Sequence, residues 1–159
     1  MGAMTVGRID GGYAVQISGT GTMREGAAVQ AFAREAFTDP RARLVLDLHD
    51  CEGLDSTFLG TLVVLHRQAQ RDPRRFVVAV DPERAAKLLG QCRLERMLTI
   101  ESERPHLDGD PTRIPAASLD PADLARLVID CHRMLAETGG PDSDAFTGVA
   151  DRLERELRR

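Results

Sequence analysis

Two short apolar segments, separated by one helix length, constrain the fold of this chain more than any other feature. Residues 43–48 and 76–80 are dominated by leucine and valine and are flanked by charged residues. Such continuous apolar runs are typical of strands buried on both faces. Between them, apolar residues recur at helical spacing over about residues 55–70. A strand–helix–strand unit of this kind predicts parallel strands joined by a right-handed crossover.

The first forty residues add a hairpin and a helix to this unit. Residues 5–9 and 13–18 have β-type patterns, and Asp10-Gly11-Gly12 between them is typical of a tight hairpin turn. Thr22-Met23-Arg24-Glu25 has the Thr-x-x-Glu form of a capping box, which predicts a helix start. The helical pattern ends before Asp39-Pro40.

A third helix and a last strand complete the pattern. Asp81-Pro82 is a typical cap and first residue of a helix, and residues 97–100 are expected to form a strand. The predicted order is ββαβαβαβ. We therefore expect an α/β fold in which a mixed β-sheet carries its helices on one main face.

The last third of the chain has a different character. Residues 102–118 contain three prolines and Gly109 without periodicity, and predict a linker or a chain lying across the domain. Residues 119–159 predict two amphipathic helices, an αα-hairpin, the first capped by Asp120. We expect a domain at 1–101, a linker at 102–118 and a helical extension at 119–159. Short helices bury little surface alone, so the hairpin should pack on the domain, on a second copy in a homodimer, or on another protein.

The charge distribution favours protein partners. Residues 1–101 hold 13 acidic and 13 basic side chains, whereas residues 102–159 hold 12 and 8, so the net charge of −4 lies in residues 102–159. This offers no electrostatic footprint for nucleic acid or an anionic membrane. The chain has no apolar stretch of membrane-spanning length, and its first residues lack the layout of a signal peptide. We expect a cytoplasmic protein.

Metal and cofactor chemistry has no support in the sequence. The three cysteines, Cys51, Cys92 and Cys131, are far apart, and the four histidines show no His-x-x-x-His spacing. Neither a disulfide framework nor a zinc site is indicated. We expect reduced cysteines, no metal and no cofactor.

One segment carries a specific resemblance. The strand Leu44-Val45-Leu46-Asp47-Leu48 leads through a short expected turn at 50–54 into Asp55-Ser56-Thr57-Phe58-Leu59-Gly60. This resembles the STAS domain family, in particular the anti-sigma factor antagonists, and the resemblance covers about residues 5–101. A helical C-terminal extension is similar to one bacterial branch of that family.

The resemblance implies a regulator without enzymatic activity. In such proteins the serine after the aspartate, here Ser56, is phosphorylated by a kinase that is itself the anti-sigma factor, and a PP2C-type phosphatase reverses the modification. Thr57 is the minor candidate for the acceptor. The residues expected to contact partners are Asp55, Thr57, Phe58, Gly60 and Thr22. The chemistry agrees, because a hydroxyl in the first turn of a helix is expected to be exposed and lies near free backbone N–H groups that stabilise a phosphate.

Two departures from the family pattern bear on partner choice. Phe58 stands where the family usually has glycine, which should change the surface beside the serine. Gly19-Thr20-Gly21-Thr22 replaces the Gly-Glu-Leu-Asp of many antagonists and removes two carboxylates near the kinase-facing loop. Gly60 is unusual inside a helix, and close packing on the sheet explains it better than a partner contact.

Other interpretations of the same residues stay open. Asp, Ser and Thr at 55–57 are also ordinary N-cap residues. A phosphoaspartate receiver using Asp47 lacks the acidic pair and the lysine it needs, since Asp10 stands alone and Lys87 lies in the third helix. No Gly-Lys-Ser/Thr sequence supports a nucleotide hydrolase. The main alternative is a STAS adaptor that binds protein constitutively, as in lipid-transport complexes, with Ser56 unmodified.

Overall fold

The chain forms one six-stranded mixed sheet, five α-helices and three 3₁₀ turns in the computed structural model, which describes residues 2–69 and 71–159. The strands are β1 (Ala3–Ile9), β2 (Gly12–Gly21), β3 (Arg43–Leu54), β4 (Phe76–Ala79), β5 (Ile100–Glu101) and β6 (Thr112–Ile114). The helices are α1 (Met23–Ala36), α2 (Ser56–Gln68), α3 (Pro82–Leu89), α4 (Pro121–Glu137) and α5 (Ser143–Leu157), with 3₁₀ turns at Pro73–Arg75, Gly90–Cys92 and Leu94–Arg96.

The sheet has the strand order β5-β4-β3-β2-β1-β6. Strands β2, β3, β4 and β5 are parallel neighbours, whereas β1 is antiparallel to both β2 and β6. The β1–β2 connection is a two-residue turn in which Gly11 has a φ of 81°, a conformation that suits glycine. The predicted mixed α/β sheet is confirmed.

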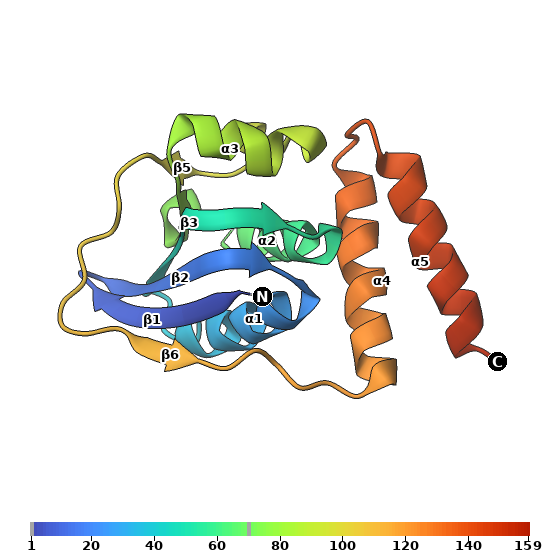
Figure 1. The fold of residues 1–159 in the computed structure, drawn as a ribbon, viewed down its shortest axis with the longest axis horizontal. Helices are drawn as coiled ribbons and strands as arrows, with labels where there is room; N and C mark the ends of the chain where they lie inside the picture. Colours follow the sequence, from blue (N-terminus) through green and yellow to red (C-terminus); the bar gives the residue numbers. More distant parts are fainter. Residues whose placement is uncertain (1, 70) are drawn as a thin grey trace.

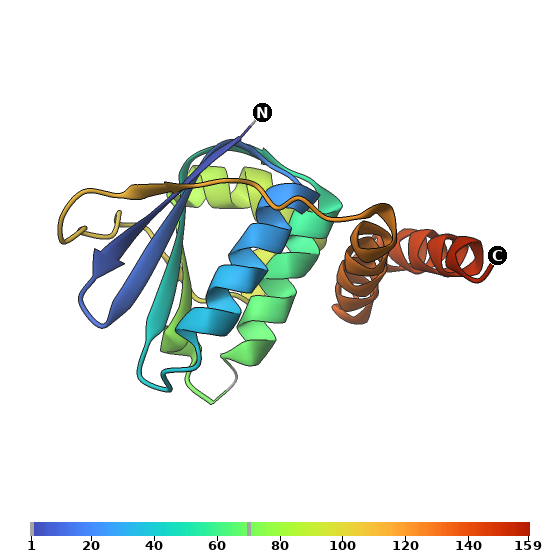
Figure 2. The same cartoon turned by 90° about the horizontal axis from the view of Figure 1, so that it is seen from below.

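Both faces of the sheet are covered, but by different material. Helices α1 and α2 lie side by side on one face (Figures 1 and 2), over the main core, to which β3 contributes Leu44, Leu46 and Leu48. Alternate residues point to the other face, where Val45 and Val77 form a smaller apolar cluster with Leu107 from the segment after β5. This alternation is the period of two that a strand requires.

The segment expected to be a linker lies across the domain. The backbone carbonyl of Ser102 is 2.8 Å from His49 Nε2, and Arg104 pairs with Asp50 at 2.5 Å. The chain then adds β6 to the edge of the sheet beside β1. No local pattern predicted β6, because this three-residue edge strand takes its hydrogen bonds from β1 and not from its own sequence.

Two expected boundaries are wrong. Residues 50–54 were expected as a turn, but β3 continues to Leu54 because β2 runs on to Gly21 and pairs with it, with register shifts on the way. Residues 97–100 were expected as the last strand, but β5 is Ile100–Glu101. The 3₁₀ turn at Leu94–Arg96 takes up the chain before it, and Met97 N–H still donates to that turn.

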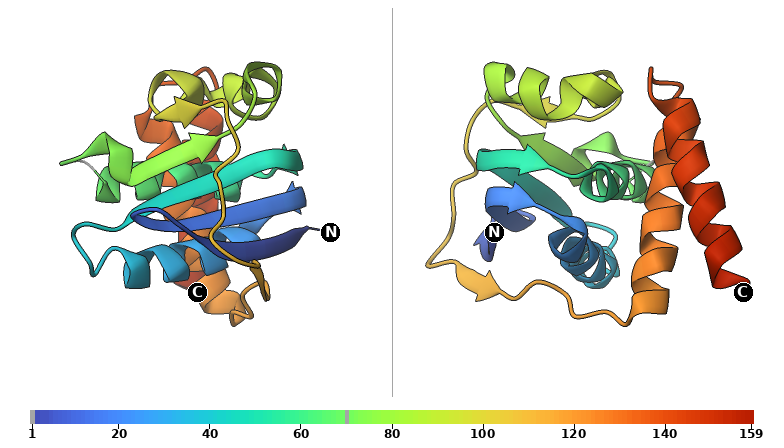
Figure 3. Two further views of the ribbon diagram at one scale, coloured as in Figure 1. Left: turned by 90° about the vertical axis from the view of Figure 1, so that its left-hand side faces the viewer. Right: turned by 45° about the vertical axis from the view of Figure 1, so that its right-hand side comes forward.

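The C-terminal helices form the predicted hairpin and pack on the domain. Helix α4 lies against α2 and α1 on their outer side, and α5 lies outermost against α4 (Figures 2 and 3). Arg133 of α4 joins the two helices by pairing with Asp151 at 3.2 Å and Glu154 at 2.5 Å of α5. Association of two copies through these helices stays a prediction.

Candidate functional site: the Ser56 end of helix α2

A single carboxylate organises the start of two helices. Asp55 adopts an extended conformation before α2, and its Oδ1 accepts a hydrogen bond from Phe58 N at 2.8 Å. Its Oδ2 accepts one from Met23 N, the first residue of α1, also at 2.8 Å. The N-cap role that an aspartate at position 55 indicates is confirmed. The same side chain also fixes α1, so two positive helix ends converge beside Ser56.

Ser56 is in contact with a histidine from the C-terminal hairpin. Its Oγ lies 2.9 Å from His132 Nε2, and His132 Nδ1 lies 2.7 Å from the carbonyl oxygen of Val128. A carbonyl only accepts, so Nδ1 carries a proton, and in the neutral ring Nε2 accepts the hydroxyl proton of Ser56. The hydroxyl of Ser56 is thereby used inside the chain.

The surroundings of this pair are largely closed to solvent. His132 is 5% exposed, and the ring of Phe146 from α5 packs edge-on against it with centroids 5.7 Å apart. Ser56 is therefore partly buried beneath α4. The expectation of an exposed hydroxyl needs correction, because a segment 76 residues away in sequence covers it.

Gly60 is a point of close contact between α2 and α4. A Cβ atom at this position would lie 2.4 Å from Cys131 Cβ and 2.6 Å from its Cα, so a side chain here has no space. The expected packing of Gly60 on the sheet is wrong. Gly60 lets the backbone of α4 approach α2, which explains a glycine inside a helix.

A small polar cluster lies next to Gly60. Gln30 of α1 donates to Thr61 Oγ1 at 3.0 Å, and both side chains lie 3.7 Å from the sulfur of Cys131. Burial is the main reason that the pKa of the Cys131 thiol rises to about 11. The cluster joins α1, α2 and α4, and its contacts to Cys131 exist only while α4 is docked.

Of the other predicted contact residues, Thr57 and Phe58 lie inside the protein and Thr22 is partly exposed. Thr57 is 3% exposed, and Phe58 is fully buried in the main core near Gly21 and Gly26. The expected contribution of Phe58 to the surface beside Ser56 is therefore wrong. Thr22 caps α1 by accepting from Arg24 N at 3.3 Å, and its hydroxyl also bonds the Glu25 carboxylate, so its predicted capping role is confirmed.

The segment from strand β1 to the residue before β5 matches a known family. Residues 4–99, more than half of the chain, match the family described as Mlab, STAS domain. The chain belongs to the STAS domain family. No curated protein matches it. The match shows the STAS family and not the anti-sigma factor antagonist subtype.

His132 and Cys131 are two residues in contact with the STAS domain that the sequence did not predict. They reach Ser56 and Gly60 from a helix outside the matched segment. Their only sequence signal is the apolar face of that helix, which does not specify the surface it covers.

A second polar group lies on the opposite face of the STAS sheet. Asp47 is 3% exposed, and its carboxylate accepts hydrogen bonds from His49 N at 2.9 Å and from Gln16 Nε2 at 3.4 Å. Its Oδ1 also lies 2.6 Å from His49 Nδ1. Asp47, the carboxylate considered for a phosphoaspartate receiver, is thus hydrogen-bonded to Gln16 and His49. His49 in turn contacts the segment that follows β5.

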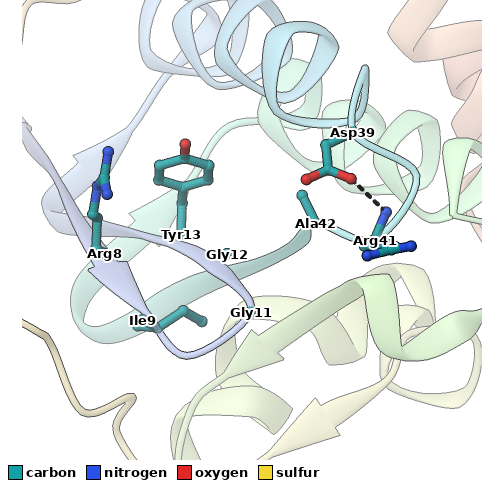
Figure 4. A pocket seen from close by; sticks show the side chains of 8 residues that line it. All are labelled: Arg8, Ile9, Gly11, Gly12, Tyr13, Asp39, Arg41 and Ala42. Carbon is teal, nitrogen blue, oxygen red and sulfur yellow. Dashed lines mark hydrogen bonds between the residues drawn. The ribbon is translucent and has the colours of Figure 1, made fainter.

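The remaining surface features lie elsewhere. A hollow of about 310 Å³ (Figure 4) lies between the β1–β2 turn and the loop holding Asp39 and Arg41, at the end of the strands opposite Ser56. Among residues 2–69 and 71–159, no three His, Cys, Asp or Glu side chains are grouped so as to hold a metal. Within the same residues, no helix is long and apolar enough to cross a membrane.

A serine hydroxyl on a histidine nitrogen is also the contact found between a nucleophile and its base. Here the other nitrogen of His132 is bonded to a main-chain carbonyl of its own helix, where the third triad member would be a carboxylate. The ring also lies under Phe146. The Ser56–His132 pair therefore holds α4 against α2.

Proposed function

We propose that this STAS protein is a non-catalytic regulator of the anti-sigma factor antagonist type, which binds a partner through the Ser56 end of α2 and is controlled by phosphorylation of Ser56. The observation that carries the proposal is the convergence of the starts of α1 and α2 on Asp55, next to Ser56 in the first turn of α2. The expected partners are an anti-sigma factor or related serine kinase and a PP2C-type phosphatase, in the cytoplasm.

The local chemistry supports a switch. Transfer of the γ-phosphoryl group of ATP forms a bond between Ser56 Oγ and phosphorus, breaks the bond to ADP, and passes the hydroxyl proton to the kinase. The product adds about −1.5 to −2 charges beside Asp55. The free N–H groups of the first turn of α2 stabilise this charge, so the domain tolerates it. A protein packed over the same turn meets like-charge repulsion and must desolvate a dianion.

Burial favours Ser56 over Thr57 as the acceptor. The Ser56 side chain is partly exposed and contacts α4. Thr57, the next residue in the same turn, is only 3% exposed. A kinase reaches Ser56 once α4 moves, but reaches Thr57 only if α2 itself is disrupted.

A second candidate function has its own support. The matched family is described as Mlab, and the Ser56 hydroxyl already has a partner in His132. Both observations fit a STAS adaptor that binds protein constitutively and is never modified at Ser56. In that case the hairpin is a permanent part of the adaptor.

Phosphorylation in vitro separates the two candidates. The full chain is incubated with ATP and the GHKL-type kinases of its own cell, and the modified residue is mapped by mass spectrometry. We expect one phosphoryl group at Ser56 and none in the Ser56→Ala protein. Incorporation that persists in Ser56→Ala, at Thr57 or elsewhere, contradicts the assignment, and no incorporation with any of these kinases supports the adaptor.

A further inference from the structure

We propose that the α4–α5 hairpin occupies the partner-binding surface of its own STAS domain, and that a phosphoryl group on Ser56 releases it. This inference rests on the proposed function in two respects, that the Ser56 end of α2 binds the partner and that Ser56 is the residue modified. It concerns an event within the chain, and is therefore testable without the partner.

The first argument is steric. Ser56 Oγ and His132 Nε2 are already in hydrogen-bond contact at 2.9 Å, so a tetrahedral phosphoryl group on Oγ has no space between them. Helix α4 is held equally close to α2 one turn further along, where Gly60 packs directly on Cys131. Modified Ser56 and docked α4 exclude each other.

The second argument concerns polar groups. Docked α4 depends on the Ser56 hydroxyl as the donor to His132 Nε2, and His132 is 5% exposed. Phosphorylation replaces the hydroxyl proton by phosphorus, which removes that donor. The new dianion lies next to Asp55, whose carboxylate is held in place by two backbone N–H groups. Leaving these charges under α4 costs more than exposing them to water.

The third argument is that the interface suits reversible docking. The contact between α2 and α4 includes the polar pairs Ser56 with His132 and Thr61 with Cys131, beside the fully buried Leu135, which belongs to the main core. The ion pair at its far end, Arg67 with Glu137 at 2.8 Å, is partly solvent-exposed. The polar part of this contact resembles transient interfaces more than a domain core.

The connection to the domain keeps a released hairpin close. Strand β6 is paired with β1, and Ala117 N donates to the carbonyl of Arg24 at 3.1 Å, so only a few residues separate a fixed point from the start of α4. Helices α4 and α5 stay joined through Arg133. A short tether gives an effective concentration in the millimolar range, so the unmodified hairpin docks again. In the unmodified chain, a partner that uses the same surface must compete with the docked hairpin, and its apparent affinity falls with the docked fraction. On the modified chain the hairpin no longer competes, and the phosphoryl charge itself repels the partner.

Alkylation of Cys131 measures release directly. In the docked state the thiol is fully buried and its pKa is about 11, so little thiolate forms near pH 8. We expect Ser56→Glu in the full chain to raise the rate of Cys131 alkylation by iodoacetamide at least about tenfold, since an exposed thiol regains an ordinary pKa. Ser118→Glu, which adds the same charge at an exposed site, should leave the rate unchanged.

Cys51 is the internal reference for folding. It is fully buried in the main core, and its alkylation should stay slow in both glutamate variants. If Cys131 of the Ser56→Glu protein is alkylated as slowly as in the wild type, the proposal is overturned. If Ser56→Glu releases the hairpin but no kinase modifies Ser56, this inference holds and the proposed function fails. If a kinase modifies Ser56 and the hairpin stays docked, this inference fails and the proposed function holds.

Gly60→Ala decides the case in which Ser56→Glu unfolds and exposes Cys51 as well. A methyl group at Gly60 should release the hairpin by contact with Cys131 while favouring the α2 helix itself. Fast alkylation of Cys131 together with slow alkylation of Cys51 then supports the proposal. The matched control is Gly148→Ala in α5, where a Cβ meets nothing within 4 Å. Slow Cys131 in Gly60→Ala shows that α4 is not displaceable and overturns the proposal.

Discussion

Leu46→Asp is expected to unfold the protein or leave it only marginally stable. Leu46 is fully buried at the centre of β3, paired with Val15 of β2 on one side and Val78 of β4 on the other, beneath the helices. A carboxylate there has no polar partner, and we expect a loss of at least about 4 kcal/mol in the free energy of unfolding. Total stabilities of about 5–15 kcal/mol are typical, so the loss is a large fraction.

Urea denaturation followed by circular dichroism measures this loss. The matched control is Leu157→Asp, the same change at a position 40% exposed near the end of α5, which should move the midpoint little. A Leu46→Asp protein with the wild-type midpoint would show that β3 is not the central strand.

Asp55→Ala is expected to cost about 2–4 kcal/mol, more than the loss of a usual helix cap. Its carboxylate accepts two backbone hydrogen bonds, from Phe58 N and Met23 N, each at 2.8 Å. A hydrogen bond to a charged group contributes about 1.5–3 kcal/mol, whereas losing an ordinary N-cap costs about 1 kcal/mol. Removing Asp55 therefore weakens the starts of α1 and α2 together.

Asp81→Ala is the comparison for this prediction. Asp81 caps only α3, by accepting from Arg84 N at 2.8 Å, and that bond is the main reason that its pKa is lowered. Its replacement should cost clearly less than that of Asp55 in the same denaturation measurement. Equal losses for the two variants would indicate that Asp55 acts as a cap of α2 alone.

The sequence predicted those parts of the fold that are set by local chemistry. The apolar run in β3, the caps Thr22, Asp55 and Asp81, and the hairpin turn at Gly11 all lie where their residue types indicate. The strand β6 and the continuation of β3 to Leu54 were missed, because both depend on hydrogen bonds from strands distant in sequence.

The site was predicted only in half. Ser56 and Asp55 follow from their position after β3, but the contacts to His132 and Cys131 depend on where an amphipathic helix docks. Gly60 carried a signal of close approach, and the approaching element was α4 and not the sheet. An apolar stripe predicts that a helix is covered, while the shape of the opposing surface determines by what.

Partner retention in the native cell tests the central claim most directly. Full-length wild type, Ser56→Ala, Ser56→Asp and the control Ser118→Asp are expressed at equal levels and isolated with their bound proteins, which are quantified by mass spectrometry. We predict that a kinase or anti-sigma factor copurifies with Ser56→Ala and is depleted about tenfold or more with Ser56→Asp, while Ser118→Asp matches the wild type. Equal partner amounts with Ser56→Ala and Ser56→Asp would contradict control of binding through Ser56.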